Sequence, residues 1–221
     1  MSKSSLASAV LSRRALLQGV GAAGLLALAP LNVQAADPEF TVVTPSVPTE
    51  SPGKIEVLEF FSYGCPHCKE FHPLLSRWVG KLPADVAFKR VPVSFGRGQW
   101  ANLARLYYTL ELTGELGRLD AEVFHALHEQ RARLFDEASI SEWVGSRGGN
   151  VAKFRETFNA FSMQPKVNRG DQLAQAYKIS GVPTLAIDGR FLVASDSFEG
   201  TLATADKLIA RIRGEKASAR K

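Results

Sequence analysis

The spacing of hydrophobic residues changes from one segment of the chain to the next. Residues 54–62 alternate and then become continuously apolar, which predicts a buried central strand. Residues 66–82 carry apolar side chains three and four apart, as in an amphipathic helix, and residues 86–93 again have the pattern of a strand. Because the connection is long enough for a right-handed crossover, the pattern predicts a parallel βαβ unit.

Residues 99–178 have a helical period throughout. Several short runs of apolar residues three and four apart are separated by glycines and polar residues. Ser139 and Glu142 form the pattern of a capping box, and Asn150 stands where it can cap the next helix. The segment predicts a block of helices that follows the βαβ unit.

Strand patterns return near the C-terminal end. Residues 184–187 and 190–194 flank Asp188 and Gly189, a dipeptide typical of two-residue hairpin turns. Residues 201–213 have the period of a last amphipathic helix. The order of βαβ unit, helical block and ββα unit predicts an α/β fold without internal repeats.

The first 35 residues have the three-part layout of an export signal. A short basic segment precedes the apolar run 15–29, and Val33 to Ala35 form a small-residue cleavage pattern. The apolar run is shorter than the roughly 20 residues that span a bilayer, which favours a cleaved signal over the alternative, an uncleaved membrane anchor. We expect cleavage after Ala35 and delivery to the periplasm.

Two adjacent arginines in the leader bear on the export route. Arg13 and Arg14 lie in a segment that resembles a twin-arginine signal. Leu16 and Gln18 stand where that signal often has Phe and Lys, so an ordinary Sec-type leader is the alternative. Both routes deliver the chain to a compartment where disulfides persist.

Charge limits the classes of partner. The chain is 45% hydrophobic and 22% charged, as soluble globular proteins are. Its formal net charge of +5 includes Lys3, Arg13 and Arg14 of the leader, and the remaining excess is too small to predict nucleic-acid binding. We therefore expect no nucleic-acid partner.

The segment that follows the leader is rich in proline and predicts an extended lead-in, with a short edge strand at residues 40–43. The basic residues after Gly214 have no apolar pattern, so we expect them to be solvated and disordered. The predicted divisions of the chain are residues 1–35 (leader), 36–98 (first αβ half), 99–178 (helical insertion), 179–213 (second αβ half) and 214–221 (basic tail).

The chain has two cysteines, Cys65 and Cys68, three positions apart. This spacing suits half of a zinc site, a small structural disulfide or a redox pair. A structural zinc needs four ligands, and only His67 and His72 stand near enough in sequence to join the two sulfurs. A disulfide that closes so short a loop gains little from chain entropy. We favour redox chemistry, without a metal or another cofactor.

Position makes Cys65 the expected thiolate. It stands where a strand gives way to a helix that begins at Pro66, so backbone N–H groups and the helix dipole favour a negative sulfur there. His67 can add a hydrogen bond or a positive charge, the alternative being an exposed histidine without effect. We expect Cys65 to face solvent and form the mixed disulfide, and the less accessible Cys68 to resolve it.

Two further positions carry chemistry. Glu59 stands six residues before the first cysteine in an apolar strand, where a carboxylate is costly unless it is paired or protonated. It is either a charge on a polar face or a buried acid that helps to move protons, with Lys89 or Arg90 as its partner. Pro183, after Val182, opens a strand and can be cis there, the alternative being a trans proline on an edge strand.

These residues together resemble the DsbA family of periplasmic thiol:disulfide interchange proteins, whose thioredoxin-like fold has an inserted helical domain. The resemblance rests on the Cys-Pro-His-Cys tetrapeptide at residues 65–68, the strand with its acid at 57–62 and the loop at 181–184, which is similar to the family's cis-Pro loop. The helical block at 99–178 resembles the inserted domain, and the whole resemblance covers about residues 40–213.

The resemblance also implies partners and roles. The residue before the cis-proline contacts the substrate backbone as an added strand would. A membrane quinone reductase of the DsbB type would reoxidise the pair. The implied site residues are Cys65, Pro66, His67 and Cys68 as catalytic, Val182 and Pro183 as substrate-binding, and Glu59 as support for proton transfer.

Two positions depart from the family pattern. His72 stands where many relatives have an acidic residue, which puts a charge pair at that place in doubt. Tyr63 and Gly64 replace a bulkier apolar pair of some members, so we expect a less hydrophobic surface around the cysteines.

We therefore expect a monomeric oxidase that donates its Cys65–Cys68 disulfide to reduced, newly exported polypeptides. The first alternative is an isomerase or reductase of the same fold. Periplasmic isomerases usually carry an N-terminal dimerisation domain, and residues 36–53 leave no room for one. The second alternative is a binding module, such as a chaperone or a metal carrier, whose cysteines are incidental.

Overall fold

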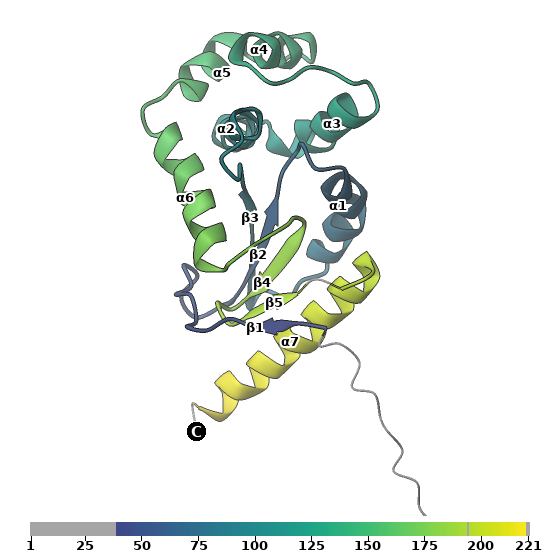
Figure 1. Ribbon diagram of the computed structural model, residues 1–221, viewed down its shortest axis with the longest axis vertical. Coiled ribbons are helices and arrows are strands. Elements are labelled where there is room, and N and C mark those ends of the chain that lie inside the picture. Colours follow the sequence, from purple (N-terminus) through teal and green to yellow (C-terminus); the bar gives the residue numbers. More distant parts are fainter. Residues whose placement is uncertain (1–38, 194, 220–221) are drawn as a thin grey trace, which may run out of the picture. The chain divides into compact units, whose positions relative to one another are not determined.

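The computed structural model describes residues 39–193 and 195–219, so the predicted leader and its cleavage site lie outside the described residues. The elements in chain order are β1 (Thr41–Val42), β2 (Ile55–Phe61), α1 (Pro66–Val79), β3 (Val86–Pro92), α2 (Gly98–Thr113), α3 (Leu116–His128), α4 (Glu137–Ser146), α5 (Val151–Phe158), α6 (Met163–Ala176), β4 (Thr184–Ile187), β5 (Phe191–Val193) and α7 (Phe198–Ser218) (Figure 1).

A five-stranded mixed sheet organises the described chain. Its strand order is β1-β5-β4-β2-β3. The β2–β3 pair is parallel, which confirms the pairing predicted from the crossover, and the other pairs are antiparallel. Asp188 and Gly189 have φ angles of 50° and 71°, the left-handed backbone that a type I′ hairpin requires. The predicted β4–β5 hairpin is therefore confirmed.

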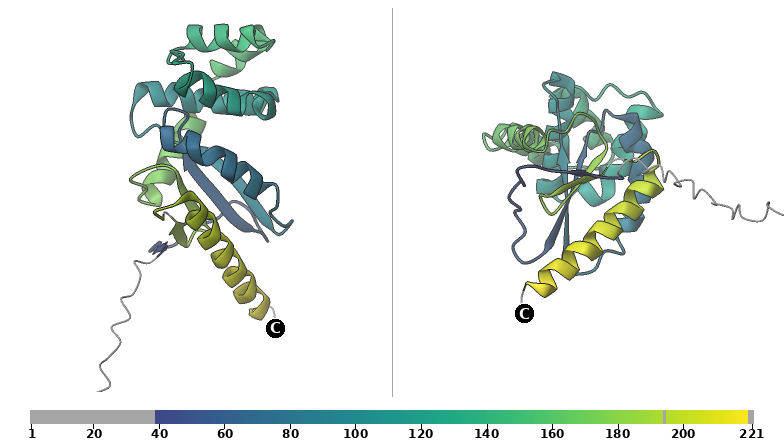
Figure 2. Two further views of the ribbon diagram at one scale, coloured as in Figure 1. Left: turned by 90° about the vertical axis from the view of Figure 1, so that its right-hand side faces the viewer. Right: turned by 60° about the horizontal axis from the view of Figure 1, so that its bottom comes forward.

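The central strand β2 is buried along its whole length because helices cover both faces of the sheet. Ile55 and Val57 share a core with α1 and α7, whereas Leu58 and Phe60 share one with α6. Figures 1 and 2 show α1 and α7 on one side of the sheet and α6 on the other. Alternate residues of β2 thus face different helices, as the period of a strand requires.

The helices α2 to α5 gather at the end of the sheet where β2 leads into α1 (Figure 1). A third core joins Phe61, Tyr63 and both cysteines to buried side chains of these helices, among them Leu106 and Phe124. The helical segment therefore covers the place where the cysteines emerge from the sheet.

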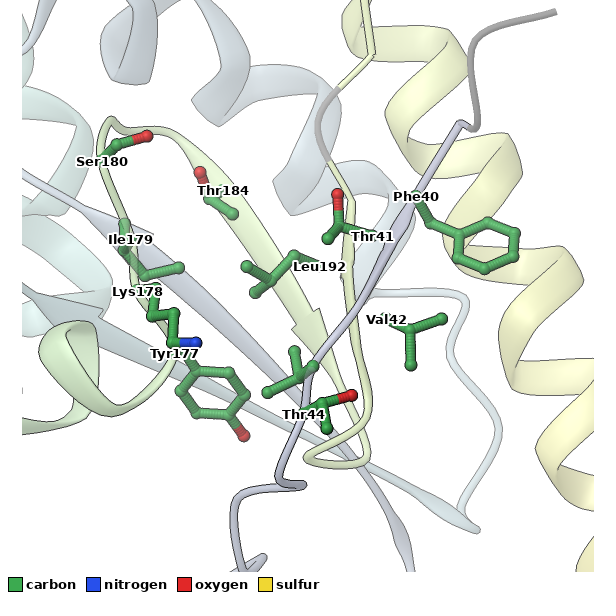
Figure 3. A pocket seen from close by; sticks show the side chains of 11 residues that line it. Phe40, Thr41, Val42, Thr44, Tyr177, Lys178, Ile179, Ser180, Thr184 and Leu192 are labelled. Atoms are coloured by element: carbon green, nitrogen blue, oxygen red, sulfur yellow. The ribbon is translucent and has the colours of Figure 1, made fainter.

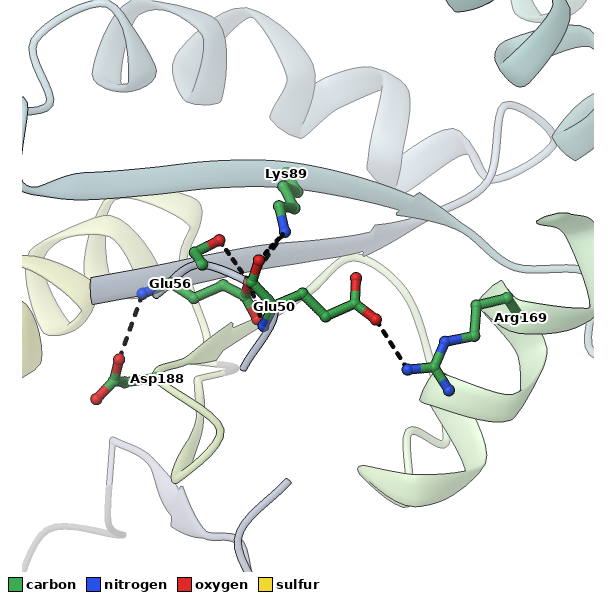
Figure 4. A network of polar contacts seen from close by, with 6 residues as sticks. Glu50, Glu56, Lys89, Arg169 and Asp188 are labelled. Atoms are coloured by element: carbon green, nitrogen blue, oxygen red, sulfur yellow. Dashed lines mark hydrogen bonds and ion pairs between the residues drawn. The ribbon is translucent and has the colours of Figure 1, made fainter. Parts of the chain in front are cut away.

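A polar network attaches the lead-in segment to the sheet (Figure 4). Glu56 is 2% exposed, and its Oε2 accepts hydrogen bonds from the backbone N–H of Glu50 at 3.0 Å, from Ser51 Oγ at 2.7 Å and from Lys89 Nζ at 3.2 Å. Arg169 of α6 binds the Glu50 carboxylate at 2.9 Å. The buried Glu56 carboxylate thus has several hydrogen-bond donors, as a buried charge requires.

Two predictions of local structure were wrong. Asp136, not Ser139, is the N-cap residue of α4, and the two side chains form the capping box. The basic tail is helical as far as Ser218, because Lys216 Nζ donates to the Lys54 carbonyl and to Asp188 Oδ1, each at 3.0 Å. The predicted cap at Asn150 is confirmed.

No helix among residues 39–193 and 195–219 is both long enough and apolar enough to cross a membrane.

Candidate active site

The cysteines lie where β2 ends and α1 begins. Cys65 is the N-cap residue of α1, with an extended backbone (φ −95°, ψ 119°), and Pro66 opens the helix at a position where its missing N–H costs nothing. Cys68 is fully buried one turn later. Cys65 is only 6% exposed, so the expectation that it faces solvent openly was wrong.

The pKa values of the two thiols are shifted in opposite directions. The pKa of Cys65 falls from 9.0 to about 6, chiefly because the Cys68 thiol donates a hydrogen bond to it. The backbone N–H groups of Cys68 and His67 and the charge of His67 add to this, while burial opposes it. Burial raises the pKa of Cys68 far above its ordinary value. Cys65 is thus the sulfur that ionises near neutral pH.

The side chain of His67 lies largely outside the site. It is 71% exposed, and its Nδ1 is 3.4 Å from Glu70 Oε2. Its contribution to the acidity of Cys65 therefore comes first from its backbone N–H and only then from its ring.

The loop before β4 brings a carbonyl group to the first cysteine. The Val182–Pro183 peptide bond is cis, and the Cys65 thiol donates a hydrogen bond to the Val182 carbonyl at 3.3 Å. A groove of about 170 Å³ begins beside them and is lined by His67, Phe71 and the start of β4 and of α7. The groove thus lies next to Cys65 through His67 and Val182, which both line it.

A larger hollow of about 460 Å³ borders the same loop on the side of α6. One wall is the segment from Phe40 to Thr44, and the other is the segment from Tyr177 to Ser180 that follows α6 (Figure 3). Thr184 lines both this hollow and the groove beside Cys65.

A buried carboxylate lies behind the cysteines. Glu59 is completely buried on the face of β2 that α1 covers, and Arg90 Nε donates to its Oε2 at 2.5 Å. Of the two predicted partners, Arg90 is the correct one, because Lys89 points to the other face of the sheet and pairs with Glu56. Burial raises the pKa of Glu59, and the Glu59 charge in turn contributes to the raised pKa of Cys68.

A family model described as DSBA-like thioredoxin domain matches residues 56–204. The chain belongs to the DsbA-like thioredoxin family. The thiol:disulfide interchange protein DsbA of Bordetella parapertussis is 39% identical over 202 residues, which are 90% of this chain and 96% of the relative. The protein of the same name from Pseudomonas aeruginosa is 36% identical over 189 residues, 84% of this chain and 88% of the relative.

Solved DsbA structures have the same fold. The crystal structure of Pseudomonas aeruginosa DsbA matches with a TM-score of 0.77 at 36% identity, covering 83% of this chain and 95% of that one. The oxidoreductase DsbA of Xylella fastidiosa matches with a TM-score of 0.74 at 30% identity, covering 79% and 95%. The predicted thioredoxin-like α/β fold is confirmed, and this DsbA-like protein is a thiol:disulfide oxidoreductase.

In this DsbA-like chain, His72 stands where many relatives have an acidic residue, and it belongs to a cluster of charged side chains. Its Nε2 is 3.3 Å from Asp120 Oδ2, and burial lowers its pKa. Asp120 also accepts two hydrogen bonds from Arg90 Nη1, at 2.9 and 2.8 Å, and one from the Tyr63 hydroxyl at 2.5 Å. Position 72 therefore still makes a polar contact, between the imidazole of His72 and the carboxylate of Asp120.

Tyr63 lies in the core and not at the surface around the cysteines. Its side chain is 1% exposed and packs against Phe61 and Phe124, so it adds nothing to the surface. Gly64 is covered by Trp100 of α2, whose indole Nε1 would lie 2.6 Å from a Cβ at that position. The helical segment thus packs directly against the residue before Cys65.

Sequence reasoning missed Asp120 and Trp100. Asp120 follows Leu119 on the amphipathic helix α3, and nothing in its spacing separates it from the exposed carboxylates of the same helix. Trp100 resembles any other apolar residue of α2. Among residues 39–193 and 195–219, no three His, Cys, Asp or Glu side chains are grouped as metal ligands would be.

Proposed function

We propose that this protein is a periplasmic oxidase that donates the Cys65–Cys68 disulfide to reduced, newly exported polypeptides. A substrate thiolate attacks Cys65 Sγ, the bond between the two cysteine sulfurs breaks, and its electron pair goes to Cys68 Sγ, which takes up a proton. A second substrate thiolate then attacks the substrate sulfur of the mixed disulfide. Cys65 leaves as a thiolate, the substrate gains a disulfide, and the enzyme is left reduced.

The observation that carries this proposal is the low pKa of Cys65, about 6. Because only the reduced protein has this thiolate, its stabilisation makes the disulfide easier to reduce and hence a stronger oxidant. At pH 7 the effect of this pKa amounts to about 1.4 kcal/mol, or about 30 mV for a two-electron couple. That is about a fifth of the span between thioredoxin and DsbA.

The remaining residues have proposed roles around this pair. Val182 offers its backbone to an extended substrate segment, and Pro183 sets the direction of the loop. Pro66 and His67 open the helix whose N–H groups face Cys65. Glu59 supplies the proton that Cys68 takes up.

We further propose the partners and the organisation that the family resemblance implies. The enzyme acts as a monomer, and a DsbB-type quinone reductase of the membrane reoxidises it. A leader cleaved after Ala35 exports the chain. The helical insertion at residues 99–178 separates the two halves at 36–98 and 179–213.

The test is the redox equilibrium of purified protein with glutathione, followed by the fraction of alkylated cysteine. We expect a midpoint far more oxidising than that of thioredoxin, about −270 mV, and rapid oxidation of a dithiol peptide. The Cys68→Ser variant should form a lasting mixed disulfide when its Cys65 thiolate attacks a one-cysteine peptide supplied as its glutathione disulfide and glutathione leaves, whereas Cys65→Ser should form none. A midpoint near that of thioredoxin would overturn the proposal, and efficient repair of a scrambled multi-disulfide protein would favour the isomerase instead.

A further inference from the structure

Two carboxylates, one guanidinium and one imidazole form a cluster beneath the cysteines. Glu59 of β2 binds Arg90 of β3, Arg90 binds Asp120 of α3, and Asp120 faces His72 of α1. The side-chain exposures are 0% for Glu59, 10% for Arg90, 16% for Asp120 and 14% for His72. The cluster thus connects α1, which carries Cys68, to α3.

The charges of this cluster do not balance. With both carboxylates ionised and His72 neutral, Arg90 offsets only one of two negative charges. An uncompensated charge in such a place is costly, and binding one proton removes it. Burial disfavours a charged His72 and lowers its pKa, whereas burial raises the pKa of Glu59. The proton therefore belongs on Glu59.

The hydrogen bonds around Glu59 leave one of its two carboxylate oxygens able to carry that proton. Arg90 Nε occupies Glu59 Oε2, and within the described residues Glu59 Oε1 is buried without a partner. The other carboxylate buried in β2 differs, because Glu56 accepts three hydrogen bonds. His72 Nε2 lies 3.3 Å from Asp120 Oδ2, and its buried Nδ1 has no partner among the same residues, which fits a neutral ring.

We propose that Asp120 is a positioning residue for the exchange reaction: together with a neutral His72 it leaves the cluster one negative charge in excess, so that Glu59 keeps a proton and gives it to Cys68 when the disulfide opens. This inference rests on the proposed function. The bond between the cysteine sulfurs breaks, Cys68 Sγ receives its electron pair and the Glu59 proton, and water later returns a proton to Glu59.

The other titratable groups around Glu59 do not take over its role as the proton donor to Cys68. Burial keeps the pKa values of Tyr63 and Tyr107 far above neutral pH, so both stay uncharged donors. The titratable and charged groups that face Glu59 or its partners are Cys68 and His72 of α1, Arg90 of β3, Tyr107 of α2, Asp120 of α3, Tyr63 before α1, and His128 of α3, whose Nε2 contacts the Tyr63 carbonyl.

The experiment follows the Glu59 side-chain carboxyl by ¹³C NMR during a pH titration of the oxidised protein. We expect the pKa of Glu59 to lie above its ordinary value of 4.5 in the wild type, because burial raises it. In Asp120→Asn, which keeps the shape of the side chain and removes the excess charge, the midpoint should fall by about one pH unit or more. His72→Gln, which is polar and uncharged like the neutral histidine, should leave the midpoint unchanged.

The matched control is Glu122→Gln on the same helix. Glu122 is 53% exposed and lies 4.0 Å from Arg147, so removal of its charge should not move the Glu59 midpoint. Single-turnover oxidation of a dithiol peptide gives a second readout. Its rate at pH 7 should fall about tenfold in Asp120→Asn, and its pH profile should move down with the Glu59 midpoint.

A wild-type Glu59 that titrates at its ordinary value would overturn the inference, whatever the variants do. A folded Asp120→Asn protein with the wild-type midpoint would overturn it as well, and so would a His72→Gln protein whose midpoint falls as far as that of Asp120→Asn. If the wild type fails to oxidise the peptide at any pH, the proposed function is wrong, while the NMR midpoints still test the cluster by themselves.

Discussion

At the scale of single residues, β2 places two glutamates in different environments three positions apart. Glu56 and Glu59 are 2% and 0% exposed and lie on opposite faces of the sheet. Glu56 accepts three hydrogen bonds and holds the lead-in segment, whereas Glu59 accepts one from Arg90 and has a second oxygen without a partner in the described part of the chain. Glu56 therefore has the fuller set of hydrogen bonds, and Glu59 is the carboxylate whose pKa burial raises.

Neutral substitutions of these glutamates should have opposite effects on the oxidised protein. Because burial raises the folded-state pKa of Glu59, its contribution to stability is complete below pH 4.5 and is lost as the pH rises through the folded-state pKa. Glu59→Gln should thus raise the free energy of unfolding at pH 7 by on the order of 1 kcal/mol, and the gain should vanish in acid. Arg90 keeps Asp120 as its partner.

Glu56→Gln is the matched substitution. It weakens three charge-assisted hydrogen bonds, so it should lower the free energy of unfolding at pH 7 by about 1–3 kcal/mol. Urea unfolding at pH 7 and in acid measures both variants. A Glu59→Gln protein that is less stable than the wild type at pH 7 would contradict the raised pKa of Glu59.

At the scale of elements, the site depends on how helices approach the sheet. The β2–α1 connection supplies the cysteines, the start of β4 supplies the Val182 carbonyl, and α3 supplies Asp120. On the opposite face, α6 comes so close to β3 that a Cβ on Gly170 would lie 2.5 Å from the Pro92 carbonyl oxygen. Packing of this kind fixes the end of β3, two residues after Arg90.

Alanine at two helical glycines separates close packing from helix propensity. Gly170→Ala in α6 places a methyl group against the Pro92 backbone, so we expect a loss of about 1–3 kcal/mol in the free energy of unfolding. Gly117→Ala in α3, where a Cβ meets nothing within 4 Å, should gain up to about 1 kcal/mol from helix propensity. Denaturant unfolding of the two variants measures both signs, and a stabilised Gly170→Ala protein would refute the close approach of α6.

At the scale of the whole molecule, the redox couple reports the acidity of one sulfur. The reduced protein carries a Cys65 thiolate above a pH of about 6, whereas Cys68 keeps its proton because burial raises its pKa. The oxidised protein carries no thiolate on either residue. Reduction therefore takes up two protons in acid and one at higher pH, and the potential depends on pH accordingly.

A plot of the midpoint potential against pH should change slope near the pKa of Cys65, about 6. Below that pH the potential should fall by about 59 mV per pH unit, and above it by about 30 mV per unit. Equilibration with glutathione at a series of pH values measures the curve. A single slope of about 59 mV as far as pH 8 would mean that Cys65 is not activated.

Much of this protein follows from local sequence. Alternation and helical spacing predicted β2, α1, β3 and the β4–β5 hairpin, because burial of one face enforces those periods within a single element. The cysteine pair and the acid in β2 could be recognised because their positions relative to the predicted strand and helix follow from the same local pattern. The tail escaped prediction, since Lys216 is held in the helix by Asp188 and the Lys54 carbonyl, which are distant in sequence.

Contacts between distant segments required the tertiary structure. Cys65 contacts the Val182 carbonyl, 117 residues away in sequence, and Arg90 of β3 contacts Asp120 of α3. No periodicity marks either pairing, because a carboxylate on a helix has the same local pattern whether it faces water or an arginine. The sequence by itself determined the fold class and the reactive pair, which depend on local spacing, while only folding decided which groups surround that pair, because desolvation and charge act through space.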